Sequence, residues 1–254
     1  YIFRVSPEGI LEHLHYGGPL RDPLNLSVHH LRTQRENTTD FEGIPHYSLA
    51  STPQEYPTYG ISDYRTPAFH GLNGDGNTVF SLRYKTHEIV QEKPRLKHMP
   101  SARGGNSETL IITLEDKVHN FEVELYYTIY ADYGVLVRSV KFTNKGEAVI
   151  DLQHVFSTSL DLPPQDCEIL HLHGTWSREF NEERLQVPKG RFVIDSAKGT
   201  SSAAHNPFLA LLEKGTTEDF GTVYATALIY SGNFAVTVEK GEFDNVRLLA
   251  GINP

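Results

Sequence analysis

The chain has 254 residues, and 23 lysines and arginines stand against 32 aspartates and glutamates, a formal net charge of −9. At this length folding removes roughly 70–75% of the unfolded chain's surface from water, so one large domain needs no disulfide or structural metal. The acidic balance disfavours nucleic acid and anionic membranes as partners, and no apolar run approaches the roughly 18 residues of a membrane span. The one cysteine, Cys167, fits a reducing compartment, so we expect a cytoplasmic location.

Thirteen tyrosines and thirteen phenylalanines, against one methionine and one tryptophan, favour strands over helices. The clearest pattern has a period of two and runs over Phe121–Tyr130, where apolar residues alternate with Glu122, Glu124 and Thr128. We place Ile129 on the apolar face of this strand. Further runs of this kind are, in chain order, 78–90, 109–115, 135–142, 149–162, 168–172, 208–212, 223–230, 234–239 and 246–249.

No segment carries apolar residues at helical spacing over three turns, and turn residues separate the predicted strands. The pattern therefore predicts an all-β fold, a two-sheet antiparallel sandwich, and argues against a (β/α)₈ barrel within these residues. Residues 17–72 and 91–107 are rich in proline and glycine and are predicted to be long loops. The chain begins in a strand-like run and has no tail, so we expect a fragment of a larger protein.

Two histidines form the first candidate site. His171 and His173 lie two residues apart on a predicted strand, so their side chains are expected on one face. With Glu179 they could hold a metal ion in the manner of a cupin site. Alternatively, they hydrogen-bond within the sandwich or line a polar groove, and the pattern alone does not decide between these interpretations.

The second candidate site lies between Glu55 and Ala68. Three tyrosines, Tyr56, Tyr59 and Tyr64, lie beside Asp63 and Arg65 and could supply aromatic faces and hydroxyl groups for a sugar. The same residues could instead be structural, with Arg65 paired to Asp63 or to a backbone carbonyl. Sequence alone cannot select a glycosidase pair among 32 carboxylates, because their separation is a property of the folded chain.

Several motifs occur in a fixed order along nearly the whole chain. They are Glu55-Tyr56-Pro57, Asp63-Tyr64-Arg65, Pro67-Ala68, Lys93-Pro94-Arg95-Leu96, the stretch from His171 to Glu179 that contains Trp176, the stretch from Gly199 to Leu211, Val223-Tyr224-Ala225, Tyr230-Ser231-Gly232-Asn233-Phe234 and Gly251-Ile252-Asn253-Pro254. Together these motifs resemble the N-terminal domain of the α-galactosidases of glycoside hydrolase family 36, the bacterial raffinose and melibiose enzymes.

The resemblance implies that residues 1–254 form a single β-supersandwich domain like galactose mutarotase. In the family this domain precedes a (β/α)₈ barrel with the aspartate nucleophile and the aspartate acid/base of a retaining mechanism, and a C-terminal β-domain follows. It therefore implies no catalytic residue, metal or cofactor in this chain, and no hydrolysis of α-galactosides by the chain alone. The domain would act as scaffold, oligomer interface and partial wall of the active site.

The resemblance also implies partners. These are an α-galactoside such as melibiose or raffinose, bound through the barrel, and further copies of the protein. In the family members that assemble as tetramers, loops of this domain reach toward a neighbouring subunit's active site. Tyr59, Asp63, Tyr64, Arg65 and Trp176 would then bind substrate as pocket wall. The sequence departs from the family at 31–40, where relatives carry Arg-x-Asp-Arg-x-Phe-Ser-Pro-Asn-Pro, and at 203–204, where Ala-Ala replaces a common His-Gln.

Two alternatives remain beside this interpretation. One is a free-standing sugar-binding sandwich that uses Tyr59, Asp63, Tyr64 and Trp176. The other is a mutarotase-like or cupin-like enzyme that uses His171, His173 and Glu179.

Overall fold

The computed structural model describes residues 1–22, 40–101 and 105–253. In these ranges it contains fifteen β-strands, two 3₁₀ helices and no α-helix. The all-β class and the antiparallel pairing predicted from the sequence are confirmed. The strands form four hydrogen-bonded sheets, where the sequence analysis predicted two. The difference arises because, among the described strands, β1 and β2 pair only with each other, and because the edge strands β7 and β13 end two separate four-stranded sheets. No helix in the described ranges is long and apolar enough to cross a membrane.

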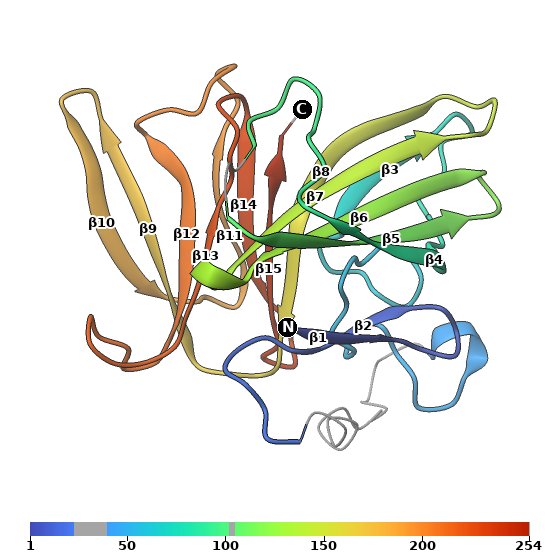
Figure 1. Ribbon diagram of the computed structural model, residues 1–254, viewed down its shortest axis with the longest axis horizontal. Coiled ribbons are helices and arrows are strands. Elements are labelled where there is room, and N and C mark those ends of the chain that lie inside the picture. Colours follow the sequence, from blue (N-terminus) through green and yellow to red (C-terminus); the bar gives the residue numbers. More distant parts are fainter. Residues whose placement is uncertain (23–39, 102–104, 254) are drawn as a thin grey trace.

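A five-stranded sheet lies at the centre of the molecule, between the labelled strands β9 and β10 at one end and β4 and β5 at the other (Figure 1). Its strands β14 and β15 are buried on both faces over most of their length, as expected for strands covered from two sides. In order across the sheet the strands are β11 (Gly190–Ser196), β14 (Phe234–Lys240), β15 (Val246–Ile252), β8 (Ile150–Leu162) and β3 (Phe69–Asn73).

A four-stranded sheet packs on one face of the central sheet. Ile169, Leu209 and Leu211 from this sheet share a buried core with Val236 and Leu248 of the central sheet. Burial of such side chains contributes roughly 1.5–3 kcal/mol each to folding. In order the strands are β10 (Arg178–Gln186), β9 (Cys167–Thr175), β12 (His205–Glu213) and β13 (Val223–Ala227).

The other four-stranded sheet contributes to a second core, which includes Leu249 from the opposite face of β15. In β6 the predicted alternation is confirmed up to Tyr127, but Thr128 is buried and Ile129 is 53% exposed. The placement of Ile129 in the apolar face is therefore wrong. The Thr128 hydroxyl lies 2.8 Å from that of Thr109, which donates to the carbonyl of Glu92. The segment that follows β4 therefore covers the face of β6 on which Thr128 lies. In order the strands are β4 (Arg83–Gln91), β5 (Ser107–Asp116), β6 (Phe121–Tyr130) and β7 (Val135–Asn144).

Smaller elements complete the described fold. The remaining elements are β1 (Ile2–Val5), β2 (Leu11–His15), η2 (Phe41–Gly43) and η3 (Ala131–Tyr133). The predicted loop at 17–72 contains η2 and the start of β3, and its residues Tyr47, Tyr56 and Glu55 are buried, so much of it is packed rather than exposed. The sequence departs from the family motif at residues 31–40, and all of these residues except Asp40 lie outside the described ranges.

Candidate functional site

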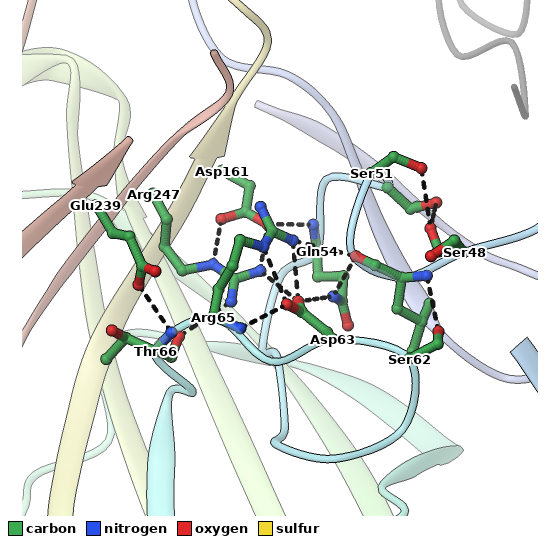
Figure 2. A network of polar contacts seen from close by, with 12 residues as sticks. Ser48, Ser51, Gln54, Ser62, Asp63, Arg65, Thr66, Asp161, Glu239 and Arg247 are labelled. Carbon is green, nitrogen blue, oxygen red and sulfur yellow. Dashed lines mark hydrogen bonds and ion pairs between the residues drawn. The ribbon is translucent and has the colours of Figure 1, made fainter. Parts of the chain in front are cut away.

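The second candidate segment is fixed to the central sheet by buried ion pairs, which Figure 2 shows. Asp63 is fully buried, and Arg65 donates two hydrogen bonds to it, from Nε at 3.0 Å and from Nη2 at 2.9 Å. Gln54 donates a further one from Nε2 at 2.7 Å. The structural alternative, in which Arg65 pairs with Asp63, is therefore the one that the structure shows.

Arg247 on β15 links this segment to two strands. Its guanidinium donates to both oxygens of Asp161 on β8, at 2.7 and 2.8 Å, and to Asp63 at 2.9 Å. A fourth bond runs to the carbonyl of Thr66 at 3.0 Å. The two arginines and two aspartates balance in charge, and almost every donor of Arg247 is used, as a buried guanidinium requires.

The charges in this network are permanent at physiological pH. Burial alone would raise the pKa of Asp63, but Arg247 and Arg65 outweigh it and lower the pKa to about 2. The pKa of Asp161 is lowered by the same two arginines against the same burial. Neither carboxyl group can exchange a proton near neutral pH, so both hold the segment in place and do not perform acid/base chemistry.

Two of the three tyrosines of the segment project outward from this anchor, whereas Tyr56 is buried and donates to the Phe156 carbonyl at 3.2 Å, so it cannot contact a sugar as predicted. Tyr64 is 59% exposed and Tyr59 is 36% exposed. Their rings meet edge to face at a centroid separation of 5.8 Å, and His70 lies 6.5 Å from the Tyr59 ring. An anchored pair of aromatic faces with phenol hydroxyls is suited to contact with a sugar.

Trp176 does not belong to this cluster. It is 90% exposed and lies in the turn between β9 and β10. In Figure 1 that hairpin is at the opposite side of the molecule from β3, which directly follows the 54–68 segment. The five predicted wall residues therefore form one group of four and one separate residue.

The exposure of Trp176 gives a direct spectroscopic expectation. Because it is the one tryptophan of the chain, native protein is expected to show the red-shifted emission of an indole in water. Acrylamide should quench that emission nearly as well before urea unfolding as after it. A blue-shifted, quencher-protected native emission would show instead that the β9–β10 turn packs against another surface.

The histidine pair lies on one face of β9, as predicted, with ring centroids 5.7 Å apart. Its carboxylate partner is Glu183 and not Glu179, which corrects the prediction. Glu183 Oε2 lies 3.2 Å from His171 Nε2 and 3.8 Å from His173 Nε2, whereas Glu179 accepts the Ser177 amide at 2.8 Å. The pairing of β10 with β9 is irregular between residues 178 and 181, so Glu179 falls outside the ladder and Glu183 stands opposite His171.

Burial lowers the pKa of His171, and this effect exceeds the opposing influence of Glu183. His205 on β12 lies near the pair, with its ring centroid 6.1 Å from that of His171. Within the described ranges, no three or more histidine, cysteine, aspartate or glutamate side chains are arranged to hold a metal ion. The distances to Glu183 favour the alternative in which the histidines make polar contacts within the sandwich.

A second buried network was missed by sequence reasoning. Glu55 is fully buried and accepts hydrogen bonds from Tyr1 at 2.8 Å and from Tyr127 at 2.9 Å, and its other oxygen lies 2.7 Å from His13 Nδ1. Arg138 on β7 lies 3.6 Å from the carboxylate. The partners are 42 to 83 positions away from Glu55 along the chain, and no local pattern signals such contacts.

The sequence matches the glycosyl hydrolase family 36 N-terminal domain over residues 9–254. The chain belongs to this family. It is 37% identical over 257 residues to the α-galactosidase AgaA of Geobacillus stearothermophilus and 37% identical over 258 residues to the α-galactosidase Mel36A of Lactobacillus acidophilus. Both matches cover 100% of this chain and 35% of the relative, so the chain spans about a third of their length.

Solved family 36 structures have the same fold over this region. The crystal structure of AgaA from Geobacillus stearothermophilus in complex with stachyose matches with a TM-score of 0.95 at 37% identity, covering 100% of this chain and 36% of that one. The AgaA complex with raffinose matches with a TM-score of 0.94 at 37% identity, covering 99% and 36%. At this identity the likeness extends to the family and not to the fold alone.

Proposed function

We propose that this chain is the N-terminal β-domain of a retaining α-galactosidase that hydrolyses terminal α-galactosides such as melibiose and raffinose-type sugars. In the whole protein it serves as scaffold, subunit interface and partial wall of the active site. The observation that carries this proposal is the match of the entire chain to about a third of AgaA and Mel36A. The raffinose and stachyose in the AgaA complexes support the substrate class.

The chemistry of the described carboxylates supports a non-catalytic role. Retaining hydrolysis needs two carboxyl groups roughly 5–5.5 Å apart that face the sugar, one of them able to give up a proton. Asp63 and Asp161 are instead buried and bound to arginine, and Glu55 is buried and bound to tyrosine and histidine side chains. The reacting aspartates of the proposed enzyme would come from a barrel outside this chain.

The same proposal includes the finer fold and the location. The two cores on opposite faces of β15 support a layered β-supersandwich of the galactose mutarotase kind. The enzyme would be a homo-oligomer, with a tetramer as the expected state, and would work in the cytoplasm.

Within this enzyme we assign the wall contact to Tyr59 and Tyr64. They are exposed and lie on a segment that the buried pairs of Asp63 and Arg65 fix to the sheet. Asp63 and Arg65 thus position the tyrosines and do not touch the sugar themselves. Trp176 would contact a different surface.

The proposed division of labour is tested with a chromogenic α-galactoside. Purified 1–254 is expected to release no aryl group above a buffer control, and the full-length protein is expected to release it readily. Release of the aryl group that copurifies with the 1–254 chain and survives a change of expression host would contradict the non-catalytic role. A full-length protein without any α-galactosidase activity would contradict the proposed function itself.

The tyrosine assignment predicts a selective effect on substrate binding. In the full-length enzyme, Tyr64→Ala is expected to raise KM for raffinose roughly 2- to 10-fold, because an aromatic contact is worth about 0.5–1.5 kcal/mol. KM for an aryl galactoside without further sugars should change little, and kcat should be retained. Tyr133→Ala is the matched control, since Tyr133 is also exposed but lies in η3, after β6. Equal effects of both substitutions would remove Tyr64 from the pocket wall.

A further inference from the structure

A groove of about 710 Å³ lies between two sheets of the described structure. One wall consists of the six consecutive residues 135–140 of β7, and the other of the seven consecutive residues 224–230 in and after β13. Five residues between β4 and β5 also line part of the groove, namely Lys93, Leu96, Met99, Pro100 and Ser101. A strand that offers its face to a cavity lines it with alternate residues, because successive side chains point to opposite faces. Consecutive lining residues show that β7 and β13 present their edges to the groove.

Both edges are open within the described residues. β7 is the last strand of its sheet and pairs only with β6, and β13 is the last strand of its sheet and pairs only with β12. Each therefore leaves every second backbone N–H and C=O without a strand partner.

The floor of the groove belongs to the central sheet. Leu160 of β8 and Leu248 and Ile252 of β15 form its apolar part, and Ser157, Thr158 and Ser159 of β8 form a polar part. The Ser159 hydroxyl is buried and has no hydrogen-bond partner among the described atoms. A floor with an apolar part between two open strand edges has the shape and chemistry of a site for strand addition, in which main-chain bonds give affinity and the floor receives alternate side chains.

We propose that this groove is occupied by an additional β-strand, formed by an apolar extended segment of the same polypeptide from the part of the enzyme outside residues 1–254. This inference rests on the proposed function, because it requires the longer protein. About two thirds of the length of the matched relatives lies outside the match to this N-terminal domain. Ile252 lines the groove, so a segment that continued from the domain in the proposed longer protein would start beside the groove, and a short connection would make the intramolecular pairing favourable.

Hydrogen exchange of the full-length protein and of 1–254, followed by mass spectrometry, tests the proposal. Amides of 135–140 and 223–227 are expected to exchange at least about tenfold more slowly in the full-length protein. Strand β10 is the matched control, because it is the opposite edge of the same sheet as β13 and lies away from the groove. Equal exchange of the β7 and β13 amides in both proteins overturns the proposal, as does concentration-dependent protection in 1–254, which would identify a second copy as the occupant.

A pair of valine substitutions in the full-length protein gives a test that does not require 1–254 to be stable. Val135 lines the groove and is 47% exposed, and Val118 lies in the β5–β6 turn and is 84% exposed. Val135→Asp is expected to lower Tm by about 5 °C or more, because the added strand would bury the new charge, and Val118→Asp by about 1 °C or less. Equal shifts overturn the proposal.

α-Galactosidase activity is measured separately, so that the two proposals can fail independently. An inactive full-length protein with protected β7 and β13 amides contradicts the proposed function and supports the added strand. An active protein with unprotected amides supports the proposed function and overturns the added strand.

Discussion

Replacing Arg247 with methionine is expected to lower the free energy of unfolding by about 3–5 kcal/mol at pH 7. Arg247 is fully buried and holds Asp63 and Asp161, so its loss leaves two ionised carboxylates in the interior with less compensation. Methionine fills a similar volume, which limits the effect to charge and hydrogen bonding. Urea unfolding followed by circular dichroism measures the change.

Arg184→Met is the matched control for this experiment. Arg184 pairs with Glu168 on the surface of the β9–β10 ladder, with Nε at 2.6 Å from the carboxylate, and its side chain is 34% exposed. An exposed pair is worth about 0–1 kcal/mol, so the control should be nearly neutral. Equal losses in the two variants would show that the buried network does not hold the 54–66 segment.

The effect of Arg247→Met should depend on pH with a defined sign. Asp63 has its folded-state pKa lowered to about 2, so its contribution is present above the ordinary aspartate value of about 3.9 and is lost as pH falls through about 2. The variant lacks most of this contribution. The difference in stability between wild type and variant is therefore expected to be largest near pH 7 and to shrink between about pH 4 and pH 2, and a pH-independent difference would contradict this account.

The regular part of the fold could be predicted because local physics determines it. Strands such as β6 and β8 alternate or carry continuous apolar runs, and both were located within one residue of their observed bounds. β10 was missed because Arg178–Gln186 is polar on both faces, which suits an exposed edge strand but leaves no period-two signal. β11, which has only a few buried positions, was missed for a similar reason.

The candidate site could be predicted only in part, since its decisive contacts are long-range. The adjacency of Asp63 and Arg65 in sequence allowed their pairing as one alternative. Their shared partner Arg247 is 184 positions away from Asp63, and no pattern within either segment connects the two. The choice between a sugar contact and a structural anchor therefore depends on burial, which only the structure gives. Asp63 is buried, whereas Tyr59 and Tyr64 are exposed.

Glu55→Gln is expected to cost about 3–5 kcal/mol of unfolding free energy at pH 7, because it removes the charge that compensates the buried Arg138 guanidinium. Glutamine keeps the shape of the side chain but cannot accept from Tyr1, Tyr127 and His13 as a carboxylate does. Tyr127→Phe, which removes one hydrogen bond to this charged group, should cost less, about 1.5–3 kcal/mol. Urea unfolding of the three proteins side by side checks this graded order.

Glu124→Gln supplies the matched control, because the same chemical change removes a partly exposed glutamate on β6 that pairs with Lys141. Its expected cost is below about 1 kcal/mol. Burial alone would raise the pKa of Glu55, but hydrogen bonding to His13 and the charge of Arg138 outweigh it and lower that pKa. Stability from Glu55 is thus present above the ordinary glutamate pKa and lost as pH falls through the lowered folded value, so the penalty of Glu55→Gln should diminish in acid. A penalty that grows in acid would mean that the carboxyl group is already protonated in the folded protein, and that Arg138 is compensated by other groups.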